Sequence, residues 1–482
     1  MSLQKLYEVI RNLYGAERGE LLIAFLMAHS ITTNQKPSLE NSKALTETTD
    51  EYKRDYLITH FSKPDEIIRV VININSSENK EILTPYLRQY SKIMNKEFII
   101  WSHLTHTIAP FSHPDRFGDD NFPLSIIEPF KNKQPFLLNN NVVFKEKVDI
   151  AYLPQIILDS NILQYVDWYV NDPAKLRENI PYVENMLRYF VSHDYLYSPY
   201  FYYFEATSKG SKREHLISPF SLLVRMQCMN KDAMLTSGVF HFDDEKFIKL
   251  KNNLNASDFD DLVNISIDIS DKFAKEFSEQ TLLVDLFYCV ITKTVLIEKN
   301  SKASNLSNKI ELLLEFLENT IKAQFSYEFI LAICYFSGKF QKFLNIQQTM
   351  KYNDAKKYLL ACAWDLLILR QPELFLAGGQ QDFTVISSVC TNDISLFHLS
   401  KIYTLDCLLK LEDHGVTLPF HKVDEPYFKT LIGEQNYDQI TSKFDFEVLL
   451  ANFSKNKNDK ITTAGIARLK HQLEQELSVI TS

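Results

Sequence analysis

The chain has 482 residues, of which 45% are hydrophobic and 23% are charged. This length predicts two to four domains, or one domain with a large insertion, and the composition excludes wholesale disorder. The formal net charge of −9, from 52 basic and 61 acidic residues, argues against a protein whose main task is to coat duplex nucleic acid, but it is compatible with a nuclease that has a local basic groove.

The cysteines and the apolar segments indicate the compartment. The six cysteines form no Cys-x-x-Cys pair, so we interpret them as buried apolar residues in a reducing compartment, not as a disulfide framework or a zinc knuckle. The apolar run Leu21–Ala28 near the start is too short to cross a bilayer and does not have the form of a signal peptide. We therefore expect a cytoplasmic protein that does not engage a membrane.

Residues 1–147 are expected to form a separate small α/β domain of unknown role. Leu3–Leu13 and Arg18–His29 carry apolar residues at helical spacing. Glu66–Asn75 has isoleucine or valine at six of ten positions and resembles a buried strand, and Glu97–Trp101 is a second candidate strand.

This segment also contains His103, His106, His113 and Asp115, which are residue types that bind zinc. Their spacing matches no tight metal-binding motif, and nearby prolines indicate a surface turn. Ordinary loop histidines are the favoured interpretation.

Leu153–Leu163 contains a short apolar run that is followed by Asp-Ser-Asn at 159–161, and we predict that this run is a buried strand. Ile156, Ile157 and Leu158 are consecutive apolar residues, which is typical of a parallel strand. Asp159 follows at the carboxyl end, where open α/β sheets bind ligands. The simpler alternative is that Asp159 only caps the next helix.

Three further acids stand alone in apolar surroundings. Glu205 lies in an aromatic helix that begins at Pro199, and Asp365 is the single charge in the buried helix Tyr358–Leu369. Asp393 follows the β-like run Val385–Cys390, and a helix is expected at 395–411. Four isolated acids in apolar frames need shared cations, and Mg²⁺ or Mn²⁺ would satisfy all of them, because these ions prefer oxygen ligands.

Taken together, Asp-Ser-Asn-Ile-Leu at 159–163, an acid on a following helix, an acid on a later helix and Thr-Asn-Asp at 391–393 resemble the acidic constellation of PIN-domain nucleases. The resemblance implies a PIN-like parallel-sheet domain over 148–425, interrupted by a helical insertion at about 209–350. A helical C-terminal segment, 426–482, follows.

The same resemblance implies a metal-dependent endoribonuclease whose substrate is RNA. Asp159, Glu205, Asp365 and Asp393 would be the catalytic ligands of Mg²⁺ or Mn²⁺. Asn161 would orient the first acid and Thr391 would support the last. A metal site needs few residues, so the N-terminal α/β unit and the helical insertion would position or restrain it, as suits a toxin-like or defence effector that needs control. A regulatory protein partner or a homo-oligomer is the expected protein partner.

The loop Ser208–His215 is the most basic candidate for nucleic-acid binding. Lys209, Lys212 and Arg213 are the cations that would contact a phosphate backbone. Three cations in eight residues are also common in solvated connections, and that interpretation is favoured for the loop taken alone.

Several alternatives remain open. The long insertion leaves Asp354 as a possible replacement for Asp365, and Asp285 is a fifth isolated acid. Arg188 and His193 have the Arg-x4-His form of HEPN ribonucleases, which cleave RNA without a metal. A non-enzymatic helical interaction protein, with its acids serving as helix caps, is the remaining alternative.

Overall fold

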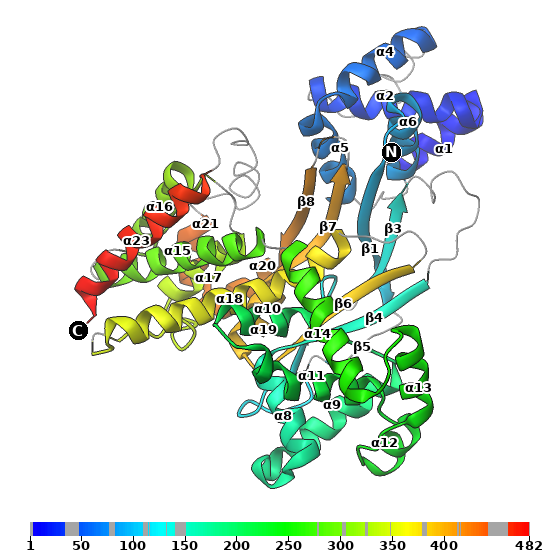
Figure 1. Ribbon diagram of the computed structural model, residues 1–482. Coiled ribbons are helices and arrows are strands. Elements are labelled where there is room, and N and C mark those ends of the chain that lie inside the picture. Colours follow the sequence, from blue (N-terminus) through cyan, green and yellow to red (C-terminus); the bar gives the residue numbers. More distant parts are fainter. Residues whose placement is uncertain are drawn as a thin grey trace.

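The structure is a computed structural model of a mixed α/β protein that is mostly helical and contains two four-stranded sheets (Figure 1). It describes residues 3–33, 48–76, 82–108, 114, 116–131, 133–139, 151–276, 279–300, 305–322, 326–347, 349–377, 383–411, 414, 416–441 and 461–481.

One sheet, called the parallel sheet below, contains the expected strand before Asp159. Its strands, in the order in which they lie, are β2 (Ser125–Ile127), β6 (Phe383–Thr391), β4 (Ala151–Leu158) and β5 (Leu196–Ser198). β4 pairs in parallel with β5 and β6, and β2 is an antiparallel edge. Ile156 and Ile157 are completely buried, as expected for a strand covered on both faces. The predicted parallel strand is confirmed.

Helices follow the parallel strands. They are α8 (Ser160–Asn171), α9 (Ile180–Ser192), α10 (Tyr200–Ser208) and α19 (Ile394–Ile402). Two short 3₁₀ turns, Pro173–Lys175 and Arg177–Asn179, separate α8 from α9. Because the carboxyl ends of parallel strands share one edge of the sheet, the residues that begin α8 and α19 lie near each other.

The other sheet is entirely antiparallel and draws on both halves of the chain. Its strands, in order, are β3 (Lys133–Asn139), β1 (Phe98–Ile108), β7 (Tyr403–Leu411) and β8 (Val416–Val423). Five N-terminal helices lie beyond it at the top of Figure 1: α1 (Leu3–Tyr14), α2 (Ala16–Thr33), α4 (Asp50–Phe61), α5 (Pro64–Ser76) and α6 (Leu83–Met94). Each sheet therefore contains strands from both sides of the domain boundary expected at residue 147. Strands β1 and β3 of this sheet precede the boundary, as does β2 of the parallel sheet.

Two expected elements are wrong. The segment predicted as a strand at Glu66–Asn75 lies in helix α5, because its buried residues Ile67, Ile68, Val70 and Val71 follow the i, i+1, i+3, i+4 spacing of a helix face. The helix expected at 395–411 ends at Ile402, and β7 follows. Alternate residues of β7 are buried at its start, which is the period-two pattern of a strand.

Helices occupy the interval in which the insertion is expected. They are α11 (Arg213–Gln227), α12 (Lys231–Ser237), α13 (Asp244–Asn253), α14 (Phe259–Glu276), α15 (Glu279–Asn300), α16 (Leu306–Phe316) and α17 (Ser326–Phe336), followed by α18 (Tyr352–Ala377). The C-terminal segment adds α20 (Glu425–Ile432), α21 (Glu434–Thr441) and α23 (Thr463–Ile480), and α23 packs on α15.

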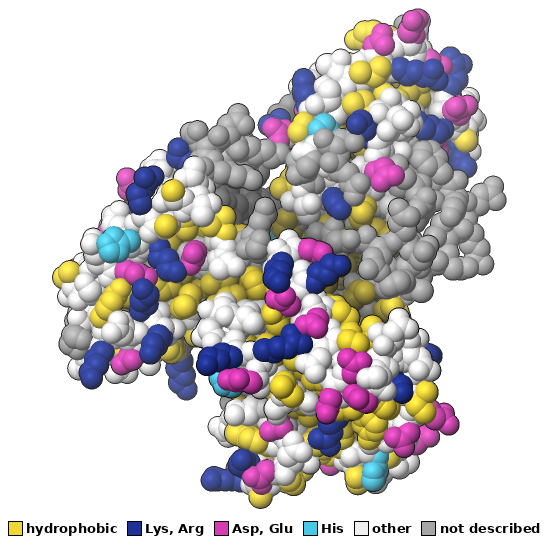
Figure 2. All heavy atoms as spheres, in the orientation of Figure 1, with side chains coloured by type: hydrophobic (Ala, Val, Ile, Leu, Met, Phe, Trp, Pro, Cys, Tyr) yellow, Lys and Arg dark blue, Asp and Glu magenta, His cyan; other side chains and the backbone are white. Residues whose placement is uncertain are grey.

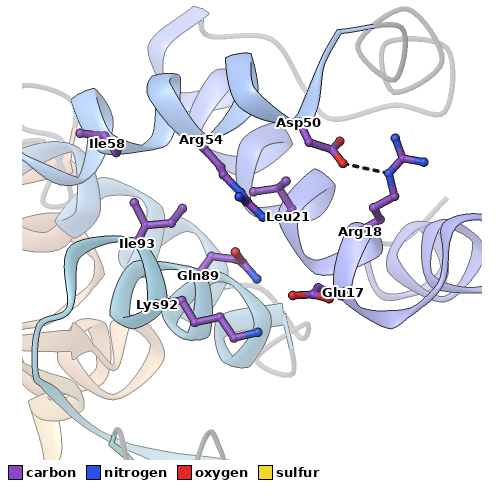
Figure 3. Close-up of a pocket in the computed structure, with 9 residues that line it drawn as sticks. All are labelled: Glu17, Arg18, Leu21, Asp50, Arg54, Ile58, Gln89, Lys92 and Ile93. Atoms are coloured by element: carbon purple, nitrogen blue, oxygen red, sulfur yellow. Dashed lines mark hydrogen bonds and ion pairs between the residues drawn. The ribbon is translucent and has the colours of Figure 1, made fainter.

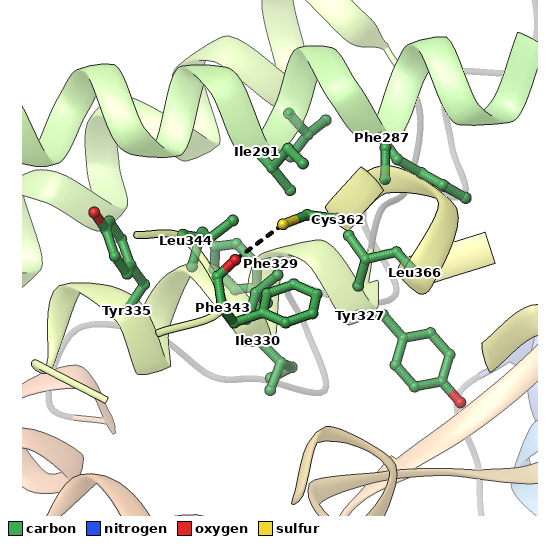
Figure 4. Packing of buried hydrophobic residues seen from close by; sticks show 14 of the residues in the cluster. Phe287, Ile291, Tyr327, Phe329, Ile330, Tyr335, Phe343, Leu344, Cys362 and Leu366 are labelled. Atoms are coloured by element: carbon green, nitrogen blue, oxygen red, sulfur yellow. Dashed lines mark hydrogen bonds between the residues drawn. The ribbon is translucent and has the colours of Figure 1, made fainter. Parts of the chain in front are cut away.

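The largest core fixes helix α18. Phe287 and Ile291 of α15 and Ile330 of α17 belong to the same buried cluster as Cys362 and Leu366 of α18 (Figure 4). The Cys362 thiol donates a hydrogen bond to the carbonyl oxygen of Phe343 at 2.9 Å. Each large apolar side chain buried here contributes about 1.5–3 kcal/mol. This packing holds the helix that carries Asp365, one turn after Cys362.

Within the described ranges, no single helix is long and apolar enough to cross a membrane. One pair of helices, Phe259–Glu276 with Thr281–Asn300, meets the length and composition of a broken span and is bent by 66°.

Candidate metal centre

Two acids follow neighbouring strands of the parallel sheet. Asp159 comes directly after β4, and Asp393 lies two residues beyond the end of β6. Leu158 pairs with Cys390, and the N–H of Asp159 donates to the Cys390 carbonyl at 3.0 Å. This register sets Asp159 beside Thr391, the last residue of β6.

The hydroxyl of Thr391 links the two acids. Its Oγ1 donates to Asp159 Oδ2 at 2.8 Å and accepts a hydrogen bond from the N–H of Asp393 at 3.0 Å. Thr391 is completely buried, so both bonds are shielded from water. The resemblance implied that Thr391 supports Asp393, and in the structure Thr391 contacts both strand-end acids.

Glu205 reaches the same edge of the sheet from α10. It is buried, with 7% of the residue exposed. The hydroxyl of Ser160 lies 3.3 Å from Glu205 Oε2 and 3.4 Å from Asp159 Oδ1, so it can donate its single proton to either carboxylate. Lys209 binds Glu205 Oε1 at 2.5 Å, one helical turn further along the chain.

Asp365 contributes the fourth carboxylate from α18. It is half-buried and makes no hydrogen bond or ion pair with any residue that the structure describes. Burial raises the pKa of Asp365 well above its usual value, and the charges of Asp159, Asp393 and Glu205 raise it further. The charge of Lys209 opposes this shift. These interactions connect carboxylates that come from four separate elements.

The strand-end acids are also electrostatically strained. Burial raises the pKa of Asp159, and the charges of Glu205 and Asp393 add to the shift, against hydrogen bonds from Thr391 and from the N–H of Asn161. Burial likewise raises the pKa of Asp393, against bonds from the start of α19. Neighbouring carboxylates disfavour each other's charged form, and a cation placed among them removes that penalty.

Helix capping explains part of this arrangement. Asp159 is the N-cap of α8 through a long 3.4 Å bond from the N–H of Asn161. Asp393 is the N-cap of α19, with bonds of 2.6 Å and 3.2 Å from the N–H groups of Ser395 and Leu396. Both strand-end residues therefore cap helices, as the simpler interpretation predicted for Asp159. Capping does not account for Glu205 and Asp365, because neither residue is at the start of its helix.

The donor chemistry of the four acids suits a hard divalent cation, because all of the donors are carboxylate oxygens. Across the described residues, however, no group of three or more histidine, cysteine, aspartate or glutamate side chains is placed closely enough to hold a metal ion. Glu205 is bound to Lys209, and Asp159 is bound to Thr391. Asp159, Glu205, Asp365 and Asp393 would hold a cation only after their side chains move closer together.

The side chains of the predicted supporting residue Asn161 and of the alternative ligands Asp354 and Asp285 lie outside this group. Asn161 is exposed, and only its backbone N–H contacts Asp159. Asp354 is exposed at the start of α18. Asp285 forms an ion pair of 2.5 Å with Lys470 of α23, which gives that lone acid a structural explanation.

The three loop cations have different surroundings. Lys209 neutralises Glu205, and Arg213 binds Asp268 at 2.5 Å. Lys212 is exposed and has no ion pair with the described residues. Of the three, only Lys209 contacts the acidic group directly.

Arg188 and His193, the two residues of the metal-independent alternative, each contact other residues. Arg188 donates to Glu184 at 2.8 Å and also to the Leu235 carbonyl. The His193 ring lies against Tyr189, with centroids 4.2 Å apart, and its Nδ1 is 2.7 Å from Ser192 Oγ. The side chains of the candidate zinc site, His103, His106, His113 and Asp115, lie outside the described residues.

The sequence did not single out the role of Ser160 or a second buried polar cluster. In that cluster Arg370 binds Glu328 at 2.7 Å, and His421 lies 2.6 Å from Glu373. These contacts join α18 to α17 and β8. Ser160 was detectable as the hydroxyl beside Asp159, but the cluster depends on contacts distant in sequence.

No protein-family model, curated protein or solved structure matches the chain in the three comparisons with known proteins.

Proposed function

We propose that the chain is a metal-dependent nuclease that cleaves RNA at the cluster of four carboxylates formed by Asp159, Glu205, Asp365 and Asp393. The observation that carries the proposal is the arrangement at the carboxyl edge of the parallel sheet, where Thr391 contacts Asp159 and Asp393 and Ser160 lies between Asp159 and Glu205. The charges of neighbouring acids also raise the pKa values of Asp159 and Asp365. Ligand sites in open α/β sheets form at this edge. Ion pairs explain Asp285, but Asp365 has no cation in direct contact among the described residues.

A bound Mg²⁺ or Mn²⁺ would supply an activated water and stabilise the leaving oxygen of a phosphodiester. The chain's own residues prepare the site. Thr391 holds Asp159 and the backbone of Asp393 in register, and Ser160 lies between the carboxylates of Asp159 and Glu205 and can donate to either. Lys209 forms an ion pair with Glu205 that an incoming cation would have to replace.

The charge of the molecule bears on the kind of RNA that it would bind. On the face shown in Figure 2, basic and acidic side chains are interspersed and form no continuous basic band. Together with the net charge of −9, this favours contact with a short single-stranded stretch over wrapping of a long duplex. Exposed Lys212 is the loop cation best placed to contact phosphate.

Cleavage of a mixed single-stranded RNA pool tests the proposal. Purified protein is incubated with Mn²⁺, with Mg²⁺ and with chelator, beside an Asp159→Asn, Asp393→Asn variant whose circular dichroism matches that of the wild type. Metal-dependent cleavage that the variant loses would support the carboxylate nuclease. Chelator-resistant cleavage that requires Arg188 and His193 would replace it with the metal-independent alternative, and absence of both cleavage and metal binding would favour an interaction protein.

A further inference from the structure

A separate cavity lies among the N-terminal helices, away from the four acids. Its volume is about 440 Å³, within the usual range for small-molecule sites. Three helices line the cavity, and each contributes residues from one of its faces. They are α2 with Glu17, Arg18 and Leu21, α4 with Asp50, Arg54 and Ile58, and α6 with Gln89, Lys92 and Ile93 (Figure 3).

The polar groups of this cavity are not fully used by the protein. Arg18 binds Asp50 at 2.9 Å and so neutralises one acid at the rim. Arg54 and Lys92 are exposed and form no ion pair with the residues that the structure describes. Two free cations therefore face one free acid, Glu17, and the cavity favours an anion.

Gln89 is the strongest indication of a ligand. The residue is only 5% exposed, yet its amide makes no hydrogen bond with any described residue. In Figure 3 the side chains of Gln89 and Arg54 extend towards the same space from α6 and α4. An amide that lines a cavity and bonds to no described residue can offer its donor and acceptor to a ligand.

We propose that this cavity binds a nucleoside monophosphate. Arg54 and Lys92 suit the phosphate, since both are donors that bind phosphate oxygens. The Gln89 amide offers a donor and an acceptor to a base edge, and the Glu17 carboxylate accepts bonds from ribose hydroxyls. Leu21, Ile58 and Ile93 provide apolar contact for a ring. The site is independent of the nuclease centre.

Titration calorimetry and thermal shift of the full chain in chelator test this proposal. The probes are the four common nucleoside monophosphates, the matching nucleosides and inorganic phosphate. We expect at least one monophosphate to bind with a millimolar or lower Kd and to raise Tm. Its nucleoside and inorganic phosphate should each bind at least about tenfold more weakly. The Asp159→Asn, Asp393→Asn variant should bind equally well, which separates this site from the proposed nuclease centre.

Substitutions locate the binding. Arg54→Gln with Lys92→Gln should weaken binding at least about tenfold. Gln89→Met should reduce the difference in Kd between nucleotides with different bases, while the contacts of Arg54 and Lys92 with the nucleotide phosphate stay intact. Arg11→Gln, an exposed cation on α1 outside the cavity, is the control and should change nothing. No saturable binding at millimolar nucleotide, equal binding of inorganic phosphate, or full binding by the Arg54 and Lys92 double variant would each overturn the proposal.

Discussion

The hydroxyl of Thr391 donates a 2.8 Å hydrogen bond to Asp159 Oδ2, although the two residues are 232 positions apart in the chain. The bond joins the ends of β6 and β4 and fixes the first acid relative to Asp393. A buried hydrogen bond to a carboxylate has a direct effect on that group's orientation and charge.

Thr391→Val keeps the side-chain volume but removes this donor. We expect RNA cleavage to fall about 10–100-fold, the usual effect of losing an outer-shell partner of a metal ligand. Thr391→Ser should retain most activity. Ser387→Ala is a matched control, because the Ser387 hydroxyl donates to Gln155 Oε1 at 2.8 Å between the same two strands. If Ser387→Ala reduced the rate as much as Thr391→Val, the effect would be general strand destabilisation.

Replacing Asp365 by asparagine should stabilise the metal-free protein at neutral pH. The pKa of Asp365 is raised in the folded state, whereas an unfolded aspartate has a pKa of about 3.9. The folded form therefore binds the proton more tightly, and the wild type loses stability as pH rises from about 4 through the raised pKa. A gain of about 1 kcal/mol would raise Tm by about 2–4 °C in a domain of 150–250 residues.

Thermal unfolding in chelator from pH 4 to pH 8 measures this difference. It should be absent near pH 4 and largest at neutral pH. Asp285→Asn is the control, because it breaks the ion pair with Lys470 and should give no gain. A less stable Asp365→Asn protein at neutral pH would show that the charge of Asp365 is already compensated.

Lys209 and a metal ion compete for Glu205 in our account. Lys209→Gln should therefore lower the Mn²⁺ concentration needed for half-maximal binding, by about 2–10-fold for a free-energy change of about 0.4–1.4 kcal/mol. Lys212→Gln removes an exposed cation of the same loop and should leave Mn²⁺ binding unchanged. Weaker Mn²⁺ binding by Lys209→Gln would mean that Lys209 organises Glu205 and does not compete with the ion.

The Arg370–Glu328 pair should be essential for stability. Glu328 is 1% exposed, and Arg370→Met leaves its carboxylate buried without that cation. We expect the free energy of unfolding, measured with urea, to fall by about 3–5 kcal/mol. Combining Arg370→Met with Glu328→Leu should recover most of the loss. A double variant as unstable as the single one would show that packing, not charge, is responsible.

Much of the parallel sheet could be predicted from local sequence. The apolar run before Asp159 and the β-like run before Thr391 both form strands, because short continuous apolar runs suit buried parallel strands. The helix that carries Asp365 was also predicted, since a segment apolar on nearly every face must be buried.

Other features depend on contacts that local patterns do not encode. The β-branched composition of Glu66–Asn75 suggested a strand, but tertiary packing on α2 and α6 selects a helix. The pairing of β1 with β7 joins residues about three hundred positions apart, so no local pattern could show that the two ends of the chain share a sheet. The ion pair of Asp285 was hidden for the same reason, because Lys470 lies on the last helix.

Direct measurement of Mn²⁺ binding by calorimetry tests the central claim, that the four acids share a divalent cation. The wild type should bind Mn²⁺ saturably, release protons on binding and bind more tightly as pH rises, because the carboxyls must be deprotonated. Asp159→Asn, Asp393→Asn should lose this binding, and Asp285→Asn should keep it. Absence of saturable binding by the wild type, or unchanged binding by the Asp159 and Asp393 variant, would contradict the account.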